Sequence, residues 1–325
     1  MEKIHPLRLV ELLKGHKVYL QTHNFPDPDA MASAFGLQYF LKMHGVETTI
    51  CYDGRIDKLS AKRMVENFGM EISQSTTLCE MKETDYIVTI DGQKYNSNFT
   101  DLCGMEVACI DHHPVVHECE YTYRDIRMVG ACASIIASYF EQTNTPMDQE
   151  VASALAYGIK MDTADFTRGA TGFDVEMFAY VYQKADIESL NRMYKNVMEY
   201  SDLKAYAAAI DNIRLYDKTG FAMIPFDCPD ALIAIISDFI LSLDVVDVSV
   251  IYSIRSNGIK FSVRSEEPKV DAGKLVANAL KGLGNGGGHK SMAGGFIPKE
   301  SSFFMEKDLE STIERLFVEE LRKLY

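Results

Sequence analysis

The sequence lacks the cysteine spacing that disulfide frameworks and cysteine-based zinc sites require. Its seven cysteines are an odd number, and no two of them form a Cys-x-x-Cys pair. Structural zinc sites place ligand cysteines a few residues apart, and disulfide-stapled domains use even numbers of them. In a chain of 325 residues, this pattern favours reduced, mostly buried thiols and a cytoplasmic location.

A long apolar run is also missing. The most apolar stretch, residues 231–254, is interrupted by Asp238, Asp244 and Asp247, and so many carboxylates make it a poor membrane span. The amino-terminal segment MEKIHPLRLVELLKGHK is charged throughout and has no apolar core of the kind that a signal peptide needs. We therefore expect a soluble protein.

The third absence is a basic stripe. The formal net charge is -14, and no run of lysine or arginine stands out. Proteins that follow long nucleic acids neutralise phosphates with such a stripe, because this electrostatic term supplies most of their non-specific affinity. Any nucleic-acid substrate should therefore be short, and part of the acidity can belong to a metal site.

The composition and the order of segments predict an α/β protein. Hydrophobic residues make up 47% and charged residues 25%, and the length suits two domains. Short β-branched runs alternate with segments of helical periodicity, which indicates a mainly parallel sheet flanked by helices on both faces. Strands are expected at residues 17–22, 47–51, 85–90 and 106–110, and helices at 30–44, 131–142, 150–159 and 174–184.

The second half predicts a smaller α/β domain behind a helical linker. Residues 186–209 contain no glycine or proline and are helical in pattern, so we expect domains at 1–185 and 210–325, with the boundary near Ser201. An Asn-Gly pair at Asn257 tolerates positive φ and indicates a hairpin. The expected elements are strands at 220–224, 246–255 and 258–263, helices at 271–281 and 302–325, and a glycine-rich turn between the helices.

The first cluster of polar residues follows the first predicted strand. Pro26 and Pro28 keep the segment out of a helix, so His23, Asp27 and Asp29 can converge on one small volume. Taken singly, Asp29 is better explained as a helix cap and His23 as a strand end. The three together favour metal binding.

Three further clusters lie at the ends of predicted elements. Asp91 closes one strand, Asp111-His112-His113 closes the next, and Asp162 leaves the end of a helix. Alone, Asp91 reads as a turn residue and Asp162 as a helix cap, whereas adjacent histidines beside a carboxylate are unusual. In open α/β sheets the ligand crevice lies at the carboxyl ends of the strands, where these residues should gather.

An oxygen-rich site with a few imidazoles suits hard cations. Mn²⁺ fits this donor set well, and Mg²⁺ is the alternative. So many carboxylates in one place repel each other unless more than one cation neutralises them. Two ions roughly 3.5–4 Å apart are the standard arrangement for in-line attack of a bridging hydroxide on phosphorus.

These motifs resemble the four motifs of the DHH phosphoesterase family and occur in the same order along the chain. The matching segments are PDPDA at 26–30, Asp91, Asp111-His112-His113 and GIKMDT at 158–163. The carboxy-terminal GGGHKSMAGG at 286–295, preceded by SVRS at 262–265, resembles the DHHA1 domain of the same family. The resemblance spans nearly the whole chain.

The resemblance implies two groups of metal ligands that share Asp91 as a bridge. The first group adds His23 and Asp27, and the second adds Asp29, His112 and Asp162. The resemblance also implies that Asp111 supports His112, and that His113 contacts the phosphate and assists the departing oxygen. Residues expected to bind substrate are Arg264, His289, Gly287, Gly288 and Ser134, although Ser134 can also be a simple cap.

The implied activity is two-metal hydrolysis of short nucleotides to mononucleotides. Compact members of the family act on nanoRNA, pApA, cyclic di-AMP or 3′-phosphoadenosine 5′-phosphate, and the two domains would close over the substrate about the linker. Met292 stands where many relatives have alanine, so substrate preference can differ. The alternatives are an inorganic pyro- or polyphosphatase with the same metals, and a non-catalytic nucleotide sensor. The sequence leaves a homodimer open, and it predicts no membrane and no long duplex as partner.

Overall fold

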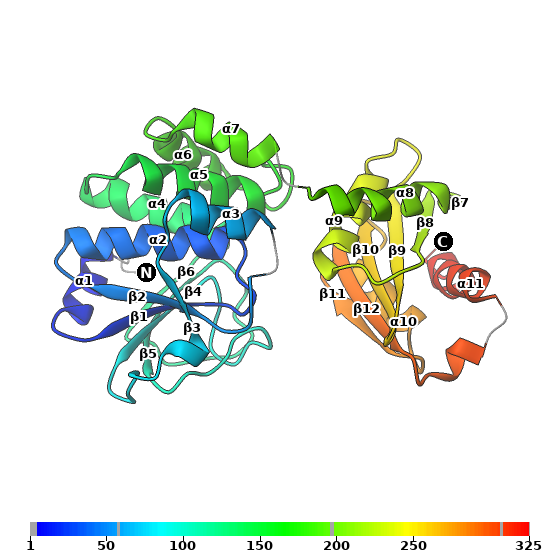
Figure 1. Cartoon of the computed structure of the whole chain (residues 1–325), viewed down its shortest axis with the longest axis horizontal. Helices are drawn as coiled ribbons and strands as arrows, with labels where there is room; N and C mark the ends of the chain where they lie inside the picture. The colour runs from blue at the N-terminus through cyan, green and yellow to red at the C-terminus, as the bar shows by residue number, and fades with distance from the viewer. Residues whose placement is uncertain (1–4, 57–58, 196–197, 306–307, 325) are drawn as a thin grey trace. The chain divides into compact units, whose positions relative to one another are not determined.

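The chain folds into two units (Figure 1). The computed structural model describes residues 5–56, 59–195, 198–305 and 308–324. Unit 1 comprises Met1–Val197 and unit 2 comprises Met198–Tyr325. Each unit has its own sheet and its own hydrophobic core.

The sheet of unit 1 has six strands in the order β3-β2-β1-β4-β5-β6, and every neighbouring pair is parallel. Because the chain moves outward from β1 in one direction and from β4 in the other, the order reverses between these two strands. Ligands of open α/β sheets bind outside the carboxyl ends of the strands at such a reversal. The strands are β1 (Val18–Thr22), β2 (Thr48–Tyr52), β3 (Ile72–Gln74), β4 (Tyr86–Ile90), β5 (Met105–Asp111) and β6 (Tyr123–Ile126).

The helices of unit 1 form one large core with one face of this sheet (Figure 1). Alternation along β1 explains the division, since Val18 and Leu20 belong to that core and Tyr19 points to the other face. The second face is covered by loop residues such as Leu78 and Leu102, where the sequence predicted helices. The helices are α1 (Pro6–Leu13), α2 (Pro28–Met43), α3 (Leu59–Asn67), α4 (Cys132–Thr143), α5 (Gln149–Asp162), α6 (Gly172–Tyr182) and α7 (Ile187–Lys195), with a 3₁₀ turn η1 (Ser75–Thr77).

The sheet of unit 2 is mixed, in the order β11-β12-β10-β9-β8-β7, and only β8 and β9 pair in parallel. Its two faces bury two separate clusters, one with α10 and α11 and one with α8 and α9. The strands are β7 (Arg214–Tyr216), β8 (Thr219–Ile224), β9 (Val248–Arg255), β10 (Gly258–Ser265), β11 (Asn285–Gly288) and β12 (Met292–Pro298). The helices are α8 (Leu203–Asp211), α9 (Asp230–Leu241), α10 (Ala272–Ala279) and α11 (Leu309–Arg322), with 3₁₀ turns η2 (Tyr200–Asp202) and η3 (Ser302–Met305).

The predicted linker helix is two helices. Leu190 and Met193 of α7 pack into the core of unit 1, whereas Ala205 and Ala209 of α8 pack into a cluster of unit 2. Residues 196–197, in the middle of the predicted helix, lie outside the described residues. The predicted glycine-rich turn is also different, because Asn285–Gly288 pairs with β12 as an edge strand.

The cysteines and the apolar character of the helices are visible in the structure. All seven cysteines are free thiols, and Cys51, Cys109, Cys132 and Cys228 are buried. Among the described residues, no helix combines the length and the apolar character that crossing a bilayer requires.

Candidate metal centre

The polar residues predicted for unit 1 gather at the point where the strand order reverses. His23 follows β1, Asp91 follows β4, and Asp111 is the last residue of β5. Asp27 caps α2, where its Oδ1 accepts from the amides of Asp29 (3.0 Å) and Ala30 (3.2 Å). The ends of three parallel strands and the start of one helix therefore bring these side chains to one edge of the sheet.

Asp162 reaches the same place from the other end of a helix. It is the last residue of α5, which packs against α2. Gly158 makes this close packing feasible, because a Cβ atom there would lie 2.7 Å from the Cβ of Ala32. The glycine four residues before Asp162 thus serves the approach of the helix that carries the carboxylate.

Asp91 lies at the centre of the cluster. Its Oδ2 is 3.6 Å from His23 Nε2, and its Oδ1 is 3.3 Å from His112 Nε2 and 3.7 Å from His113 Nδ1. Its backbone has a φ of 53°, in the left-handed region that aspartate tolerates better than most residues. The buried Oδ1 has no hydrogen-bond partner among the described residues, so this oxygen has lone pairs to offer a cation.

In the part of the chain that the structure describes, three overlapping groups of side chains have ligand atoms within 4.8 Å of one another. Asp91 belongs to two of them, and His112 also belongs to two. The groups are His23 with Asp27 and Asp91; Asp29 with His112 and Asp162; and Asp91 with His112 and His113. The fold therefore brings all six predicted metal ligands together. They fall into two groups with Asp91 between them, as two cations bridged by one carboxylate would need.

The two histidines of this set are held with the same ring nitrogen inward. The Nδ1 of His23 lies 2.8 Å from the carbonyl oxygen of Asn24, and the Nδ1 of His112 lies 3.1 Å from that of Val129. Since a carbonyl only accepts, Nδ1 carries the proton and Nε2 faces the carboxylates. Histidines that ligate metals are oriented in this way by a hydrogen bond from the other ring nitrogen.

The carboxylates of the cluster repel one another, and a positive charge among them would relieve this repulsion. Burial, and then the carboxylates of Asp91 and Asp162, raise the pKa of Asp29 well above its usual range. Burial, and then Asp27 and Asp91, raise the pKa of Asp162 to about 6. Burial disfavours a charged His112, but the attraction of the carboxylates of Asp91, Asp29 and Asp162 prevails and raises its pKa to about 11. Because a proton or a cation relieves the same repulsion, this donor set fits divalent metals.

Asp29 is anchored by the start of α4. Its two oxygens accept from the amides of Cys132 (2.7 Å) and Ala133 (2.9 Å), and the side chain is buried. The amides at a helix start attract anions, so they fix this carboxylate in place. The resemblance implied that Ser134 of this helix binds substrate, whereas the first amides of the helix bind Asp29.

Asp111 holds His113 and not the ring of His112, which corrects the role implied by the resemblance. Its Oδ1 accepts from the Nδ1 of His113 at 2.9 Å and from the backbone amide of His112 at 2.8 Å. Although burial raises the pKa of Asp111, the hydrogen bond from His113 and its charge outweigh it, so the pKa falls below the usual value. The imidazole of His112 is oriented by Val129 instead.

Gln93 is a residue of the site that the sequence did not reveal. Its Nε2 donates to Asp111 Oδ2 at 2.7 Å and to the carbonyl oxygen of His113 at 3.1 Å, and the side chain is 2% exposed. The only signal was its position two residues after the strand-end Asp91. Gln93 fixes Asp111, and Asp111 fixes the ring of His113.

Ser134 lies in a different network. It is buried, and its hydroxyl donates to Asp174 Oδ1 at 2.6 Å. It is not the cap of α4, since Ala131 occupies that position. Among the described contacts, none joins the Ser134 side chain to the carboxylate cluster.

The residues predicted to bind substrate in unit 2 sit on neighbouring strands. Arg264, on β10, donates from Nε to Asp238 Oδ1 at 2.6 Å and from Nη1 to Ser262 Oγ at 3.1 Å. It pairs with Met292 on β12. His289 follows β11 and is exposed, and its backbone amide donates to the Met292 carbonyl at 2.7 Å.

The glycine run on β11 is required in part by packing. A Cβ on Gly286 would lie 2.4 Å from Val276 of α10, and one on Gly288 would lie 2.5 Å from the Met292 carbonyl oxygen. Gly288 also has a φ of 153°. A Cβ on Gly287, in contrast, would meet nothing within 4 Å. Of the two glycines predicted to bind substrate, Gly287 alone has no packing reason to be glycine.

We expect Gly288→Ala to destabilise unit 2 by roughly 1–3 kcal/mol, because the methyl group meets backbone that cannot move away. The matched control is Gly287→Ala, whose effect should stay within about 0.5 kcal/mol. Chemical denaturation of both variants checks the difference. Equal stability of the two variants would contradict this reading of β11.

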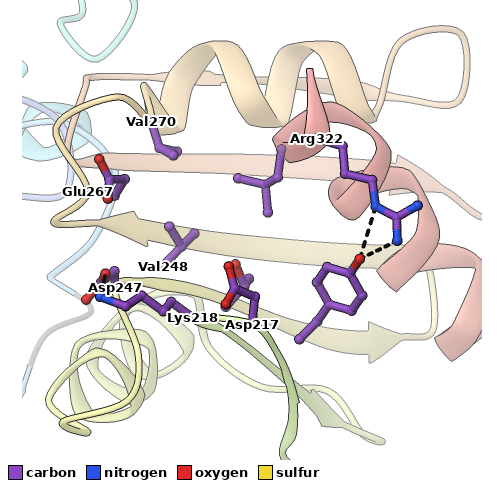
Figure 2. A pocket seen from close by; sticks show the side chains of 10 residues that line it. Asp217, Lys218, Asp247, Val248, Glu267, Val270 and Arg322 are labelled. Carbon is purple, nitrogen blue, oxygen red and sulfur yellow. Dashed lines mark hydrogen bonds and ion pairs between the residues drawn. The ribbon is translucent and has the colours of Figure 1, made fainter. Parts of the chain in front are cut away.

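Unit 2 also contains a pocket of about 360 Å³ that the sequence did not reveal (Figure 2). Among its lining residues, Lys218 Nζ lies 2.8 Å from Asp247 Oδ2, and Arg322 Nε donates to the Tyr216 hydroxyl at 3.0 Å. None of the predicted site residues is among its lining residues. Its charged groups of both signs are therefore separate from the predicted substrate residues.

Comparisons with known proteins find a family model for each of the two units. Residues 17–159 match the family model described as DHH family, N-terminal domain, and residues 217–317 match the DHHA1 domain. An uncharacterized protein of Methanocaldococcus jannaschii is 28% identical over 90% of this chain and 60% of its own length. A "probable manganese-dependent inorganic pyrophosphatase" of Streptococcus thermophilus is 23% identical over 45% of this chain and 48% of its own.

A solved structure shares the fold of the whole chain. The exopolyphosphatase-related protein from Bacteroides fragilis superposes with a TM-score of 0.80 and covers 100% of this chain and 99% of its own. Its sequence identity is 17%, so the likeness concerns the fold. The match spans 60% of the Methanocaldococcus protein, which is longer than this chain, and 48% of the streptococcal protein, where it covers only part of each sequence.

Proposed function

The chain belongs to the DHH family and carries a DHHA1 domain after its DHH domain, and on this premise we propose that it is a metal-dependent phosphoesterase that hydrolyses short nucleotides to mononucleotides. The observation that carries the proposal is the position of Asp91, whose two oxygens face His23 on one side and His112 on the other. A structural role alone would not require a buried carboxylate oxygen without a hydrogen-bond donor.

Two divalent cations, Mn²⁺ before Mg²⁺, are the proposed cofactors. His23 and Asp27 would hold one of them, Asp29, His112 and Asp162 the other, and Asp91 would contact both. Such cations make a water molecule acidic enough to attack near neutral pH, and they neutralise charge on the phosphoryl oxygens. The named manganese-dependent relative supports the choice of metal.

His113 is the proposed acid of the reaction. Its Nδ1 is engaged with Asp111, so Nε2 is the nitrogen left to meet substrate, and nearly half of the side chain is exposed. The hydrogen bond to Asp111 raises the pKa of His113 above its ordinary value, which favours the protonated ring. This proton can be donated to the oxygen that leaves phosphorus.

The substrate we propose is a short nucleotide such as nanoRNA, pApA or 3′-phosphoadenosine 5′-phosphate. The net charge of -14 disfavours long nucleic acids, and Arg264 and His289 of the DHHA1 domain are the proposed phosphate-binding groups. The seven free thiols support a cytoplasmic enzyme. The second candidate is hydrolysis of inorganic pyrophosphate, which the name of the streptococcal relative favours.

A substrate panel tests the proposal. It contains an RNA dinucleotide and pentanucleotide, pApA, cyclic di-AMP, 3′-phosphoadenosine 5′-phosphate, pyrophosphate and tripolyphosphate, each with Mn²⁺, with Mg²⁺ and with a chelator. We expect mononucleotide release that requires the metal. Release of phosphate from the inorganic substrates alone would move the function to the second candidate, and stoichiometric nucleotide binding without turnover would indicate a sensor.

Gln93→Ala should lower kcat about tenfold without changing the number of Mn²⁺ ions bound. The substitution leaves Asp111 Oδ2 without its buried donor. We expect this loss to cost about 1–3 kcal/mol of the free energy that keeps Asp111, and through it the His113 ring, in place for catalysis. Gln93→Glu should be worse, because it sets a carboxylate against Asp111. Gln142→Ala, at an exposed amide of α4, is the matched control. An unchanged kcat for both Gln93 variants would show that Asp111 needs no such support.

A further inference from the structure

Exposed apolar side chains recur on the loops at the edge of the sheet that carries the candidate metal centre. They lie on the loops that follow β1, β4, β5 and β6, at the sheet edge where the carboxylates gather. Large apolar side chains on the surface of a monomer usually occur singly, so their recurrence on four loops at one edge needs an explanation. We call this set the apolar rim, and its members are Phe25, Tyr95, Val115, Val116 and Met128.

Phe25 is the member nearest in sequence to the metal ligands. It stands two residues after His23 and two before Asp27, so its Cα lies within roughly 7 Å of the Cα of both. Its side chain is 52% exposed. An aromatic ring is therefore offered to solvent beside the site at which a phosphate would bind.

The backbone of Phe25 is held in a costly conformation. Its φ is 57°, which is a genuine outlier for a bulky residue. The loop is fixed on both sides, since Asn24 Nδ2 donates to Thr100 Oγ1 at 2.9 Å and the Phe25 amide donates to the Asp53 carbonyl at 3.4 Å. Such strain persists where the surroundings impose it, and it clusters at functional sites.

The ring of Phe25 rests on Gly54. A Cβ on Gly54 would lie 3.0–3.3 Å from three atoms of the ring, so only glycine leaves space for the ring there. The φ of Gly54 is 75°, which also favours glycine. One side of the ring is thus supported by backbone, and the exposed part remains free to receive a flat partner.

We propose that Phe25 stacks against the nucleobase of the substrate while the adjoining phosphate lies at the metal centre. This inference rests on the proposed function and narrows its substrate class to phosphates that carry an aromatic base. Stacking uses the face common to every base, so the site should accept different bases with little preference. Inorganic pyrophosphate would gain nothing from the ring.

Binding of AMP and of ribose 5-phosphate to the Mn²⁺-loaded full chain tests the inference, because the two ligands differ only by the base. The wild type should bind AMP more tightly. Phe25→Leu, which keeps an apolar side chain, should reduce this preference roughly tenfold or more, and Phe25→Tyr should keep it within about threefold. Tyr182→Leu, at an exposed aromatic residue of α6, is the matched control.

The outcomes separate this inference from the proposed function. A wild type that prefers AMP, with the preference lost only in Phe25→Leu, supports the stacking role even if no nucleotide is hydrolysed. A wild type that cleaves pApA but binds AMP and ribose 5-phosphate equally overturns the stacking role and leaves the function standing. If Phe25→Leu weakened the binding of AMP and of ribose 5-phosphate equally, the stacking role would also be overturned. The ring would then support the protein structure and would not contact the base.

Discussion

Replacing Asp91 with asparagine should lower kcat by at least roughly a thousandfold and abolish tight binding of the second cation. An amide offers one oxygen, so it cannot face His23 and His112 together as the carboxylate does. Asparagine tolerates the left-handed backbone at this position, where φ is 53°, so the fold should survive. The loss should therefore be confined to metal binding and catalysis.

Calorimetric titration with Mn²⁺ and steady-state kinetics on pApA measure the two effects. The matched control is Asp165→Asn, because Asp165 has nearly the same backbone conformation, with a φ of 55°, but is exposed and pairs with Lys160. The control should bind two ions and keep its activity. Two ions bound tightly by Asp91→Asn would refute the bridging role.

Asp174→Ala should destabilise unit 1 by about 3 kcal/mol and lower its Tm by roughly 6–12 °C. The buried carboxylate accepts from the amides of Gly130 and Thr171 (both 2.8 Å), from Ser134 Oγ (2.6 Å) and from Thr171 Oγ1 (2.7 Å). Without it, these donors are left unpaired in the interior. Gly130 directly precedes the start of α4 that anchors Asp29, so Mn²⁺ affinity should fall as well.

The control for this substitution is Asp174→Asn. The amide keeps one oxygen for the two backbone donors, and its nitrogen can donate to a rotated Ser134 hydroxyl. We expect less than half the loss of stability seen with alanine. Similar losses for both variants would mean that the negative charge of Asp174, and not its hydrogen bonds, is what stabilises the unit.

The effect of Asp174 should also depend on pH. Burial raises its pKa, but the hydrogen bonds from Ser134 and Thr171 outweigh this and bring the pKa below the usual value. A depressed folded-state pKa stabilises the protein above the unfolded pKa and loses that contribution as the pH falls through the folded one. The difference in stability between wild type and Asp174→Ala should therefore shrink below about pH 4.

The clustering of the candidate metal ligands could be predicted from the sequence because each lies at a strand or helix end with a local signal. His23, Asp91 and His112 directly follow strands, and two prolines shape the loop that carries Asp27 and Asp29. The order of parallel strands brings such ends to one edge, so sequence position is enough to predict that they meet. The parallel sheet itself could be predicted for the same reason, from its alternation with helices.

What depends on orientation could not be predicted. Whether Asp111 holds His112 or His113 is decided by which ring turns toward it, and both are adjacent in sequence. The contact from Gln93 requires a loop path that no periodicity encodes. Likewise, the glycines of β11 look like a turn until the side chain of Val276 on α10 is known to lie against them.

The division of the predicted linker between α7 and α8 bears on how this architecture can evolve. Leu190 and Met193 pack into the core of unit 1, and Ala205 and Ala209 pack into a cluster of unit 2. Each half of the segment is therefore a part of its own unit. A recombination event between these helices would leave both hydrophobic interiors intact. Unit 1 could thereby acquire a different second unit without any new mutation among its candidate metal ligands.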